Sequence, residues 1–263
     1  MTATSLLLVG HGFPHRPRAR HPVQDHAERL QRPSLFDEVV PALMKGEPEL
    51  DEGLRSIPAG RTVVVPLFVS DGYFVGEALP DRVEAGRPGD VTVEYAQPVG
   101  THEDVTEIIL RRALSAVDDS PTDVELALLG HGSEHGSANR GAVESHARRI
   151  NERNLFATVR SYFIEEEPHV ERLPGECTSG KVIAVPVFMA RGHHVREDIP
   201  EQLGLAGGDD AVEGTQITCT DPIGTDPMVA DIAFSRAIDA TGDAWREAPD
   251  GTPDRRQIRR NTL

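Results

Sequence analysis

Two histidines and one carboxylate in the second half of the chain have the residue types that bind a divalent metal ion. His131 directly follows an apolar run in the segment LALLGHG, and Glu165 closes another in SYFIEEEP. His194 follows a third apolar run, in MARGHHVRED. Two imidazoles and a carboxylate suit a borderline ion such as Co²⁺, Ni²⁺ or Fe²⁺. The same imidazoles can accept protons from a substrate whose N–H groups are displaced as the metal enters.

Each motif has a simpler interpretation when it is taken alone. A Gly-His-Gly turn after a strand can be a tight turn with a capping histidine. The adjacent His193 and His194 can be solvated loop residues, and a run of glutamates such as 165–167 is usually a solvated face. We favour a single site because the three motifs follow three strands whose carboxyl ends meet at one edge of a parallel sheet.

The chain contains an internal repeat with an offset of 120 residues, the separation of His11 from His131. LLLVGHG corresponds to LALLGHG, and VVVPLFVSDGYFV corresponds to VIAVPVFMARGHHV. A constant offset over such a length indicates gene duplication and fusion. We therefore expect an N-terminal repeat at 1–119, a C-terminal repeat at 120–241 that carries the active site, and a flexible tail at 242–263.

Each half is expected to alternate strands with helices. The expected strands are 5–9, 62–69 and 91–96 in the first half, and 125–129, 158–163, 181–189 and 216–220 in the second. The expected final helices are 103–116 and 227–241, and an earlier helical pattern follows each histidine turn. This alternation predicts an α/β fold with a parallel sheet and helices on both of its faces.

A comparison of the two halves places the chemistry in the second one. The first half keeps His11, but Phe74 stands at the position of His194 and Lys45 at the position of Glu165. The loss of two of three candidate ligands would abolish a metal site. We expect the first half to be a scaffold with a degenerate site, in which His11 keeps a contact with substrate.

The composition limits the classes of partner. Acidic residues number 43 against 27 basic ones, the formal net charge is −16, and Lys45 and Lys181 are the only lysines. So negative a surface argues against nucleic acid as a partner and indicates a salt-rich environment. No apolar stretch approaches the roughly 20 residues that a membrane helix needs, and the N-terminus lacks the features of a signal peptide. We expect a cytoplasmic protein without a membrane partner.

Three segments resemble the class II chelatases, which include the CbiX-type sirohydrochlorin cobaltochelatases and their iron and nickel relatives. The resemblance extends to about Thr241 and is carried by GHGSEHGSANRGAVESHARRI, SYFIEEEP and VIAVPVFMARGHHVREDIPEQL. It implies two tandem flavodoxin-like repeats, each a parallel sheet with helices on both faces, with a cleft between them. It also implies a lyase that inserts a divalent metal, Co²⁺ in the first place, into sirohydrochlorin without ATP, as in cobalamin biosynthesis.

The resemblance implies roles for single residues as well. His131 and His194 would bind the metal and act as catalytic groups, with Glu165 as the accompanying carboxylate. His194 is preferred to His193 because the family motif places histidine directly before the valine of this loop. Polar and basic residues near these loops are expected to contact the anionic tetrapyrrole; these are Ser133, Asn139, Arg140, Arg191, Arg196 and His11.

Several alternatives stay open at this point. Iron insertion for siroheme and nickel insertion use similar ligands, because affinity follows the ion more than the site. A non-catalytic tetrapyrrole or metal carrier would bind stoichiometrically without turnover. A phosphate-ester or nucleotide enzyme is disfavoured, since no GxxxxGK[ST] occurs and no GxGxxG follows the first strand. We expect no permanently bound cofactor, because the metal is a substrate, and a monomer, with a dimer as the alternative.

Overall fold

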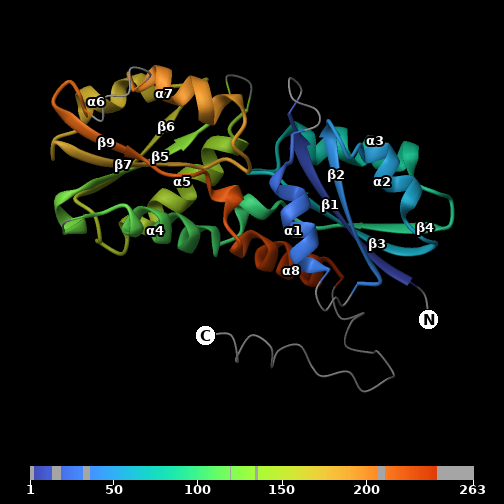
Figure 1. The fold of residues 1–263 in the computed structure, drawn as a ribbon. Coiled ribbons are helices and arrows are strands. Elements are labelled where there is room, and N and C mark those ends of the chain that lie inside the picture. Colours follow the sequence, from blue (N-terminus) through green and yellow to red (C-terminus); the bar gives the residue numbers. More distant parts are fainter. Residues whose placement is uncertain are drawn as a thin grey trace.

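The computed structural model describes residues 3–13, 19–31, 36–118, 120–133, 136–205 and 211–241. Two α/β lobes lie side by side, each built on one sheet (Figure 1). The strand order is β2-β1-β3-β4 in the first sheet and β6-β5-β7-β9-β8 in the second. All pairings are parallel except that of the short β8 with β9. The predicted fold class is thereby confirmed.

The elements follow the predicted alternation in both halves. The strands are β1 (Ala3–Gly12), β2 (Glu38–Lys45), β3 (Gly60–Leu67), β4 (Val91–Tyr95), β5 (Glu125–Gly130), β6 (Thr158–Phe163), β7 (Lys181–Pro186), β8 (Ala211–Val212) and β9 (Thr215–Cys219). The α-helices are α1 (Pro22–Leu30), α2 (Leu50–Ser56), α3 (Leu79–Gly86), α4 (Val105–Ser115), α5 (Ala138–Asn151), α6 (Leu173–Glu176), α7 (Ile199–Gln202) and α8 (Met228–Thr241). Short π-helical segments, Phe74–Ala78 and His194–Asp198, precede α3 and α7.

The third strand of each half ends earlier than the sequence predicted, at Leu67 and at Pro186. From Phe68 and Phe188 onward, the backbone bonds to a turn. The carbonyl of Phe68 accepts the N–H of Gly100, and that of Phe188 accepts the N–H of Gly224. The residues after each strand are thereby directed away from the sheet and into the loops that carry the site.

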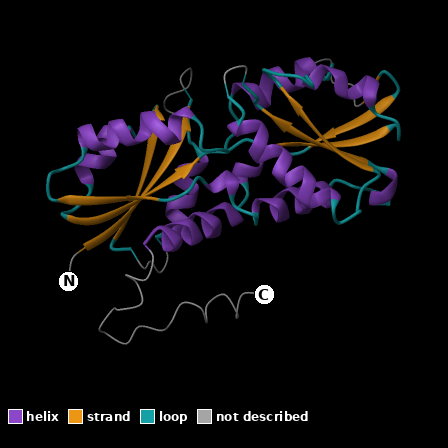
Figure 2. Ribbon diagram, turned by 180° about the vertical axis from the view of Figure 1, so that it is seen from behind, coloured by secondary structure: helices purple, strands orange, loops and turns teal. Residues whose placement is uncertain are grey.

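The final helix of each half packs in the other lobe. Helix α4 contacts α5 and β7, whereas α8 contacts α1 and β3, as the ribbon views show from opposite sides (Figures 1 and 2). One buried apolar cluster consequently includes residues of both halves, among them Val23, Ile109, Val143 and Val229. The two packed lobes thus exchange their last helices. The ranges 1–119 and 120–241 are the two halves of the sequence repeat, and as domain limits they stay predictions.

Two buried histidines fix this exchange. His26 in α1 has its Nε2 2.8 Å from the carbonyl oxygen of Gly224, in the turn before α8. His146 in α5 has its Nε2 2.8 Å from the carbonyl oxygen of Gly100, in the turn before α4. Burial lowers the pKa of both imidazoles, so they are neutral donors to these carbonyls at neutral pH.

The described part of the chain contains no helix long and apolar enough to cross a membrane. The predicted tail at 242–263 lies outside the described residues.

Candidate metal site

His131 lies at the carboxyl end of β5, in a turn that glycine makes feasible. Gly132 has φ of +78°, and a Cβ there would lie 2.7 Å from Cγ of Glu166. The Nδ1 of His131 is 2.9 Å from the carbonyl oxygen of Gly132. A proton on Nδ1 satisfies this carbonyl and leaves the Nε2 lone pair for a metal ion.

His194 begins the π-helical segment that follows β7, and its ring meets that of His131. The two ring centroids are 4.6 Å apart with the planes at 86°. The Nδ1 of His194 lies 2.5 Å from Oδ2 of Asp198, one helical turn further on. Asp198 therefore holds this ring so that Nε2 is again the free nitrogen. The Nε2 atoms of two neighbouring imidazoles are thus the nitrogens left for a metal ion.

His193 is directed differently from its neighbour. Its Nδ1 lies 3.2 Å from Oε1 of Glu197 and its Nε2 3.3 Å from Oδ1 of Asp198. Both ring nitrogens face carboxylates, and the side chain is 56% exposed, so His193 offers no free nitrogen toward His131. This geometry agrees with the choice of His194 as the ligand of the pair.

Glu165 is tied to His131 by its backbone rather than by its carboxylate. Its N–H donates to the carbonyl oxygen of His131 at 2.9 Å, while the residue itself is exposed. Within the described residues, no group of three or more His, Cys, Asp or Glu is arranged to hold a metal ion. The structure therefore brings the two histidines together and leaves the third predicted ligand beside them, without closing a three-ligand site.

Three of the residues predicted to contact the substrate, Ser133, Asn139 and Arg140, also take part in hydrogen bonds that hold the His131 loop, and their role toward a substrate stays a prediction. Asn139 accepts the N–H of Gly132 through Oδ1 at 3.0 Å. Glu166 accepts the N–H of Ser133 at 3.1 Å and pairs with Arg140, whose Nη2 lies 2.7 Å from Oε2. The Arg140 guanidinium also covers the ring of Phe163, 4.6 Å from its centroid. In this structure Arg140 thus holds Glu166, which in turn accepts a hydrogen bond from the His131 loop.

Arg191 and Arg196, two further residues predicted to contact the substrate, differ in whether a carboxylate neutralises their charge. Arg191 pairs with Asp221. Arg196 donates from Nε to the carbonyl oxygen of Arg191 at 2.9 Å, is exposed, and meets no carboxylate in the described ranges. Arg196 is thus the arginine near His194 whose charge is left for an anionic ligand.

The first lobe presents an aromatic counterpart of the site. His11 meets Phe74 edge to face at 4.8 Å between ring centroids, which reproduces the His131–His194 contact with one imidazole replaced. Phe68 stacks on Phe74 at 6.2 Å, and the Nζ of Lys45 lies 5.6 Å from the Phe74 centroid. At the position that corresponds to His194, this lobe therefore has a phenyl ring in place of an imidazole.

The loops that follow the strands of the first lobe lie against those of the second lobe. A Cβ on Gly192 would lie 3.4 Å from the ring of Phe13, and one on Gly72 would lie 3.9 Å from Cβ of Ala138. Burial, and to a smaller degree the charge of Lys45, lowers the pKa of His11. The Gly192–Phe13 and Gly72–Ala138 approaches thus bring the loops of the two lobes together at their junction.

Asp198 and Glu166 hold residues of the candidate site, and the sequence did not point to either of them. Asp198 follows His194 by four residues, the spacing that places side chains on one helical face, and this signal could have been used. Glu166 is 26 residues from Arg140, and no local pattern links the two. Its adjacency to Glu165 in a glutamate run hides it further.

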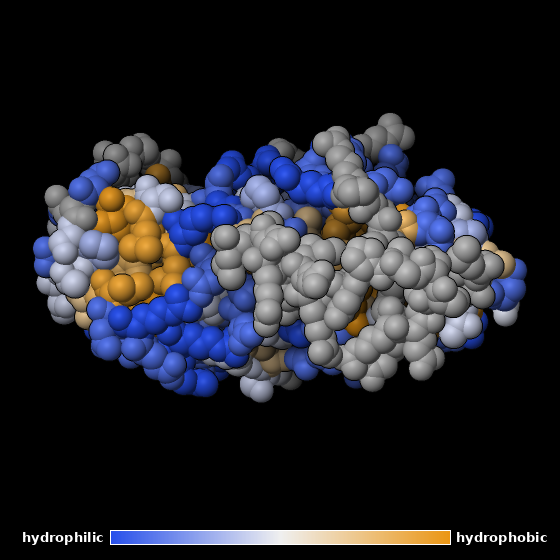
Figure 3. Space-filling model, turned by 90° about the horizontal axis from the view of Figure 1, so that it is seen from below, coloured by the Kyte–Doolittle hydropathy of each residue, from blue (hydrophilic) through white to orange (hydrophobic). Residues whose placement is uncertain are grey.

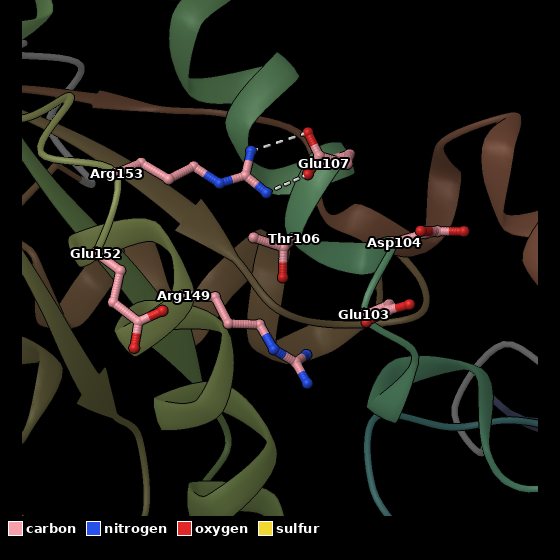
Figure 4. Close-up of a pocket in the computed structure, with 7 residues that line it drawn as sticks. All are labelled: Glu103, Asp104, Thr106, Glu107, Arg149, Glu152 and Arg153. Carbon is pink, nitrogen blue, oxygen red and sulfur yellow. Dashed lines mark hydrogen bonds and ion pairs between the residues drawn. The ribbon is translucent and has the colours of Figure 1, made fainter. Parts of the chain in front are cut away.

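A separate hollow lies between α4 and α5 and contains none of these residues (Figure 4). Its lining consists of Glu103, Asp104, Thr106, Glu107, Arg149, Glu152 and Arg153. Arg153 and Glu107 neutralise one another in a bidentate pair. The hollow has no histidine or thiol and is not the metal site.

Comparisons with known proteins identify the family of the chain. The CbiX family model matches residues 5–116 and again 125–240, so it matches each repeat. A Halobacterium salinarum protein named "Probable sirohydrochlorin cobaltochelatase" is 34% identical, over 91% of this chain and 94% of its own length.

Two solved structures share the fold. A multi-domain Deinococcus radiodurans protein, described as similar in structure to chelatases, has a TM-score of 0.73 and 27% identity; the match covers 90% of this chain and 55% of that one. The sirohydrochlorin chelatase SirB of Bacillus subtilis, solved with cobalt, has a TM-score of 0.71 and 18% identity, over 93% of this chain and 98% of its own. The matched repeats, the shared fold and the paired histidines show that this chain belongs to the CbiX family.

Proposed function

We propose that this protein is a sirohydrochlorin chelatase that inserts a divalent metal ion, Co²⁺ in the first place, in cobalamin biosynthesis and without ATP. The observation that carries the proposal is the His131–His194 pair, whose rings meet at 4.6 Å with both Nδ1 atoms already occupied. The name of the Halobacterium relative supports both the macrocycle and the metal. The metal is a substrate, and no resident cofactor is needed.

In the proposed reaction, the Nε2 atoms of His131 and His194 hold the ion, and the exposed Glu165 carboxylate completes the ligand set when the ion arrives. The anionic macrocycle enters between the facing loops, with Arg196 near its edge. As the ion moves to the ring nitrogens, the imidazoles it leaves accept pyrrole protons. Metal and proton thus compete for the same nitrogens.

Iron insertion for siroheme and nickel insertion stay alternatives, because two imidazoles and a carboxylate accept all three ions. A cytoplasmic location, a monomeric state and the absence of nucleic-acid and membrane partners stay predictions from the sequence.

The proposal is tested by following the absorbance of sirohydrochlorin in molar salt with Co²⁺, Fe²⁺ or Ni²⁺ added singly. We expect insertion above the spontaneous rate, fastest with Co²⁺. A spectral change that saturates at one equivalent of protein without turnover would instead identify a carrier. Faster insertion of Fe²⁺ or Ni²⁺ would keep the chelatase and replace the metal.

A further inference from the structure

The first lobe carries an unpaired cation where the second carries the predicted metal carboxylate. Lys45 is the last residue of β2, beside Gly12 of β1, and corresponds to Glu165. Its Nζ lies over the ring of Phe74, and no carboxylate pairs with it in the described part of the chain. In a chain of net charge −16 with only two lysines, such a cation is unusual.

The surroundings of Lys45 suit an aromatic anion. The Phe74 ring lies near those of Phe68 and Tyr73, with centroid distances of 6.2 Å and 5.7 Å. Tyr73 is 66% exposed, the most exposed large apolar side chain in the described ranges. The close approach of Gly192 to Phe13, and of Gly72 to Ala138, shows that the loops of this lobe lie against those of the lobe that carries His131 and His194. Aromatic rings pack on flat π-systems, and a lysine ammonium pairs with a carboxylate as a point charge.

We propose that the first lobe is the organic-substrate half of the site: Lys45 binds a peripheral carboxylate of the tetrapyrrole, and the aromatic cluster of Phe68, Tyr73 and Phe74 packs against its ring. This inference rests on the proposed function and assigns the macrocycle's position within it. Where the second lobe has Glu165, whose carboxylate can bind a cation, the first lobe has Lys45, whose ammonium group can bind an anion. The degenerate repeat thereby has its own binding role.

The test is an equilibrium titration of full-length protein with metal-free sirohydrochlorin, followed by its fluorescence, together with steady-state kinetics of Co²⁺ insertion. Lys45→Ala is compared with Lys181→Ala, because Lys181 lies at the amino end of β7, the opposite end of a strand. We expect Lys45→Ala to raise both Kd and KM for sirohydrochlorin about five- to tenfold with kcat within about twofold. Lys45→Glu should raise them further, Lys45→Arg should restore most of the loss, and Lys181→Ala should match wild type.

The outcomes separate this inference from the proposed function. If sirohydrochlorin binds and is not metallated, the chelatase proposal fails, and the titration still tests Lys45. If insertion proceeds but Lys45→Ala and Lys181→Ala have the same Kd, the role of Lys45 is overturned while the chelatase stands. A fall in kcat at unchanged Kd would likewise contradict a binding role.

Discussion

At the scale of single residues, the proposed metal site depends on how each imidazole is held. The position of His131 and His194 at one edge of the sheet was predictable from the sequence, because each follows an apolar run that reads as a parallel strand. Their orientation was not, since it comes from the Gly132 carbonyl and from Asp198. The Glu165 carboxylate was predicted as a third ligand, and its exposed position leaves that role a prediction.

Asp198 should be a positioning residue for metal binding. Asp198→Ala removes the acceptor at His194 Nδ1, frees the ring to rotate and should weaken Co²⁺ binding about 10- to 100-fold. Asp198→Asn, which keeps an acceptor oxygen, should lose less. Co²⁺ titration of the metal-free protein measures this, with Glu197→Gln as the control because Glu197 contacts His193. Unchanged Co²⁺ affinity in Asp198→Ala would remove Asp198 from the site.

His21 should make the fold sensitive to acid. It is 2% exposed, its Nδ1 accepts the N–H of Val23 at the start of α1, and burial lowers its pKa to about 4. The unfolded chain takes up this proton near pH ~6.5 and the folded one only near 4, so stability is lost as pH falls through that interval. The loss from this residue is on the order of 3 kcal/mol.

Urea unfolding at several pH values measures this effect. His21→Asn keeps an N-cap and cannot titrate, so its stability should fall less than that of wild type between neutral pH and about pH 4.5. Identical pH slopes for the two proteins would show that His21 does not contribute.

At the scale of the elements, the strands and helices of both halves were predictable from apolar periodicity, but the exchange of α4 and α8 was not. Periodicity identifies which face of a helix is buried and not which sheet covers it. Here the partner of α4 is set by tertiary contacts, such as the 2.9 Å approach of the Thr106 hydroxyl to Nδ1 of His146. The repeat itself conceals the exchange, because both arrangements give the same order of elements.

The His26–Gly224 and His146–Gly100 contacts hold the exchanged helices, and only His146 has a second hydrogen bond, to Thr106. One variant can therefore remove this bond and another can add its counterpart. Nδ1 of His146 has Thr106, whereas Nδ1 of His26 is buried without a partner in the described chain, and Ala230 stands at the repeat position of Thr106. Thr106→Val should therefore destabilise the protein by about 1–3 kcal/mol. Ala230→Thr should offer His26 the missing partner and stabilise by up to about 1 kcal/mol. Denaturant midpoints measure both, and equal effects of the same sign would contradict the assignment.

At the scale of the whole molecule, the excess of acidic residues opposes folding at low salt. At a net charge of −16 the acidic side chains repel one another. Salt screens this repulsion, because the Debye length falls from about 10 Å at 0.1 M salt to about 3 Å at 1 M. The thermal midpoint should therefore rise steadily between about 0.1 M and 2 M KCl. Thermal unfolding followed by circular dichroism measures it. A midpoint that is flat or falls over this range would show that the acidic surface is not an adaptation to salt.

The overall arrangement also explains why two similar halves can do different work. Both lobes present a histidine at the end of their first strand, yet His131 meets His194 and His11 meets Phe74. One lobe thus has a pair of neighbouring imidazoles, and the other has an aromatic and cationic cluster at the corresponding place.

The most direct measurement is the rate of Co²⁺ insertion into sirohydrochlorin by His131→Ala and by His11→Ala, the same substitution at equivalent positions of the two repeats. We expect His131→Ala to lose about 100-fold or more in kcat/KM, because a metal ligand and proton acceptor is gone. His11→Ala should keep kcat within a few-fold of wild type. Equal losses in the two variants, or a larger loss in His11→Ala, would contradict the placement of the metal site in the second half.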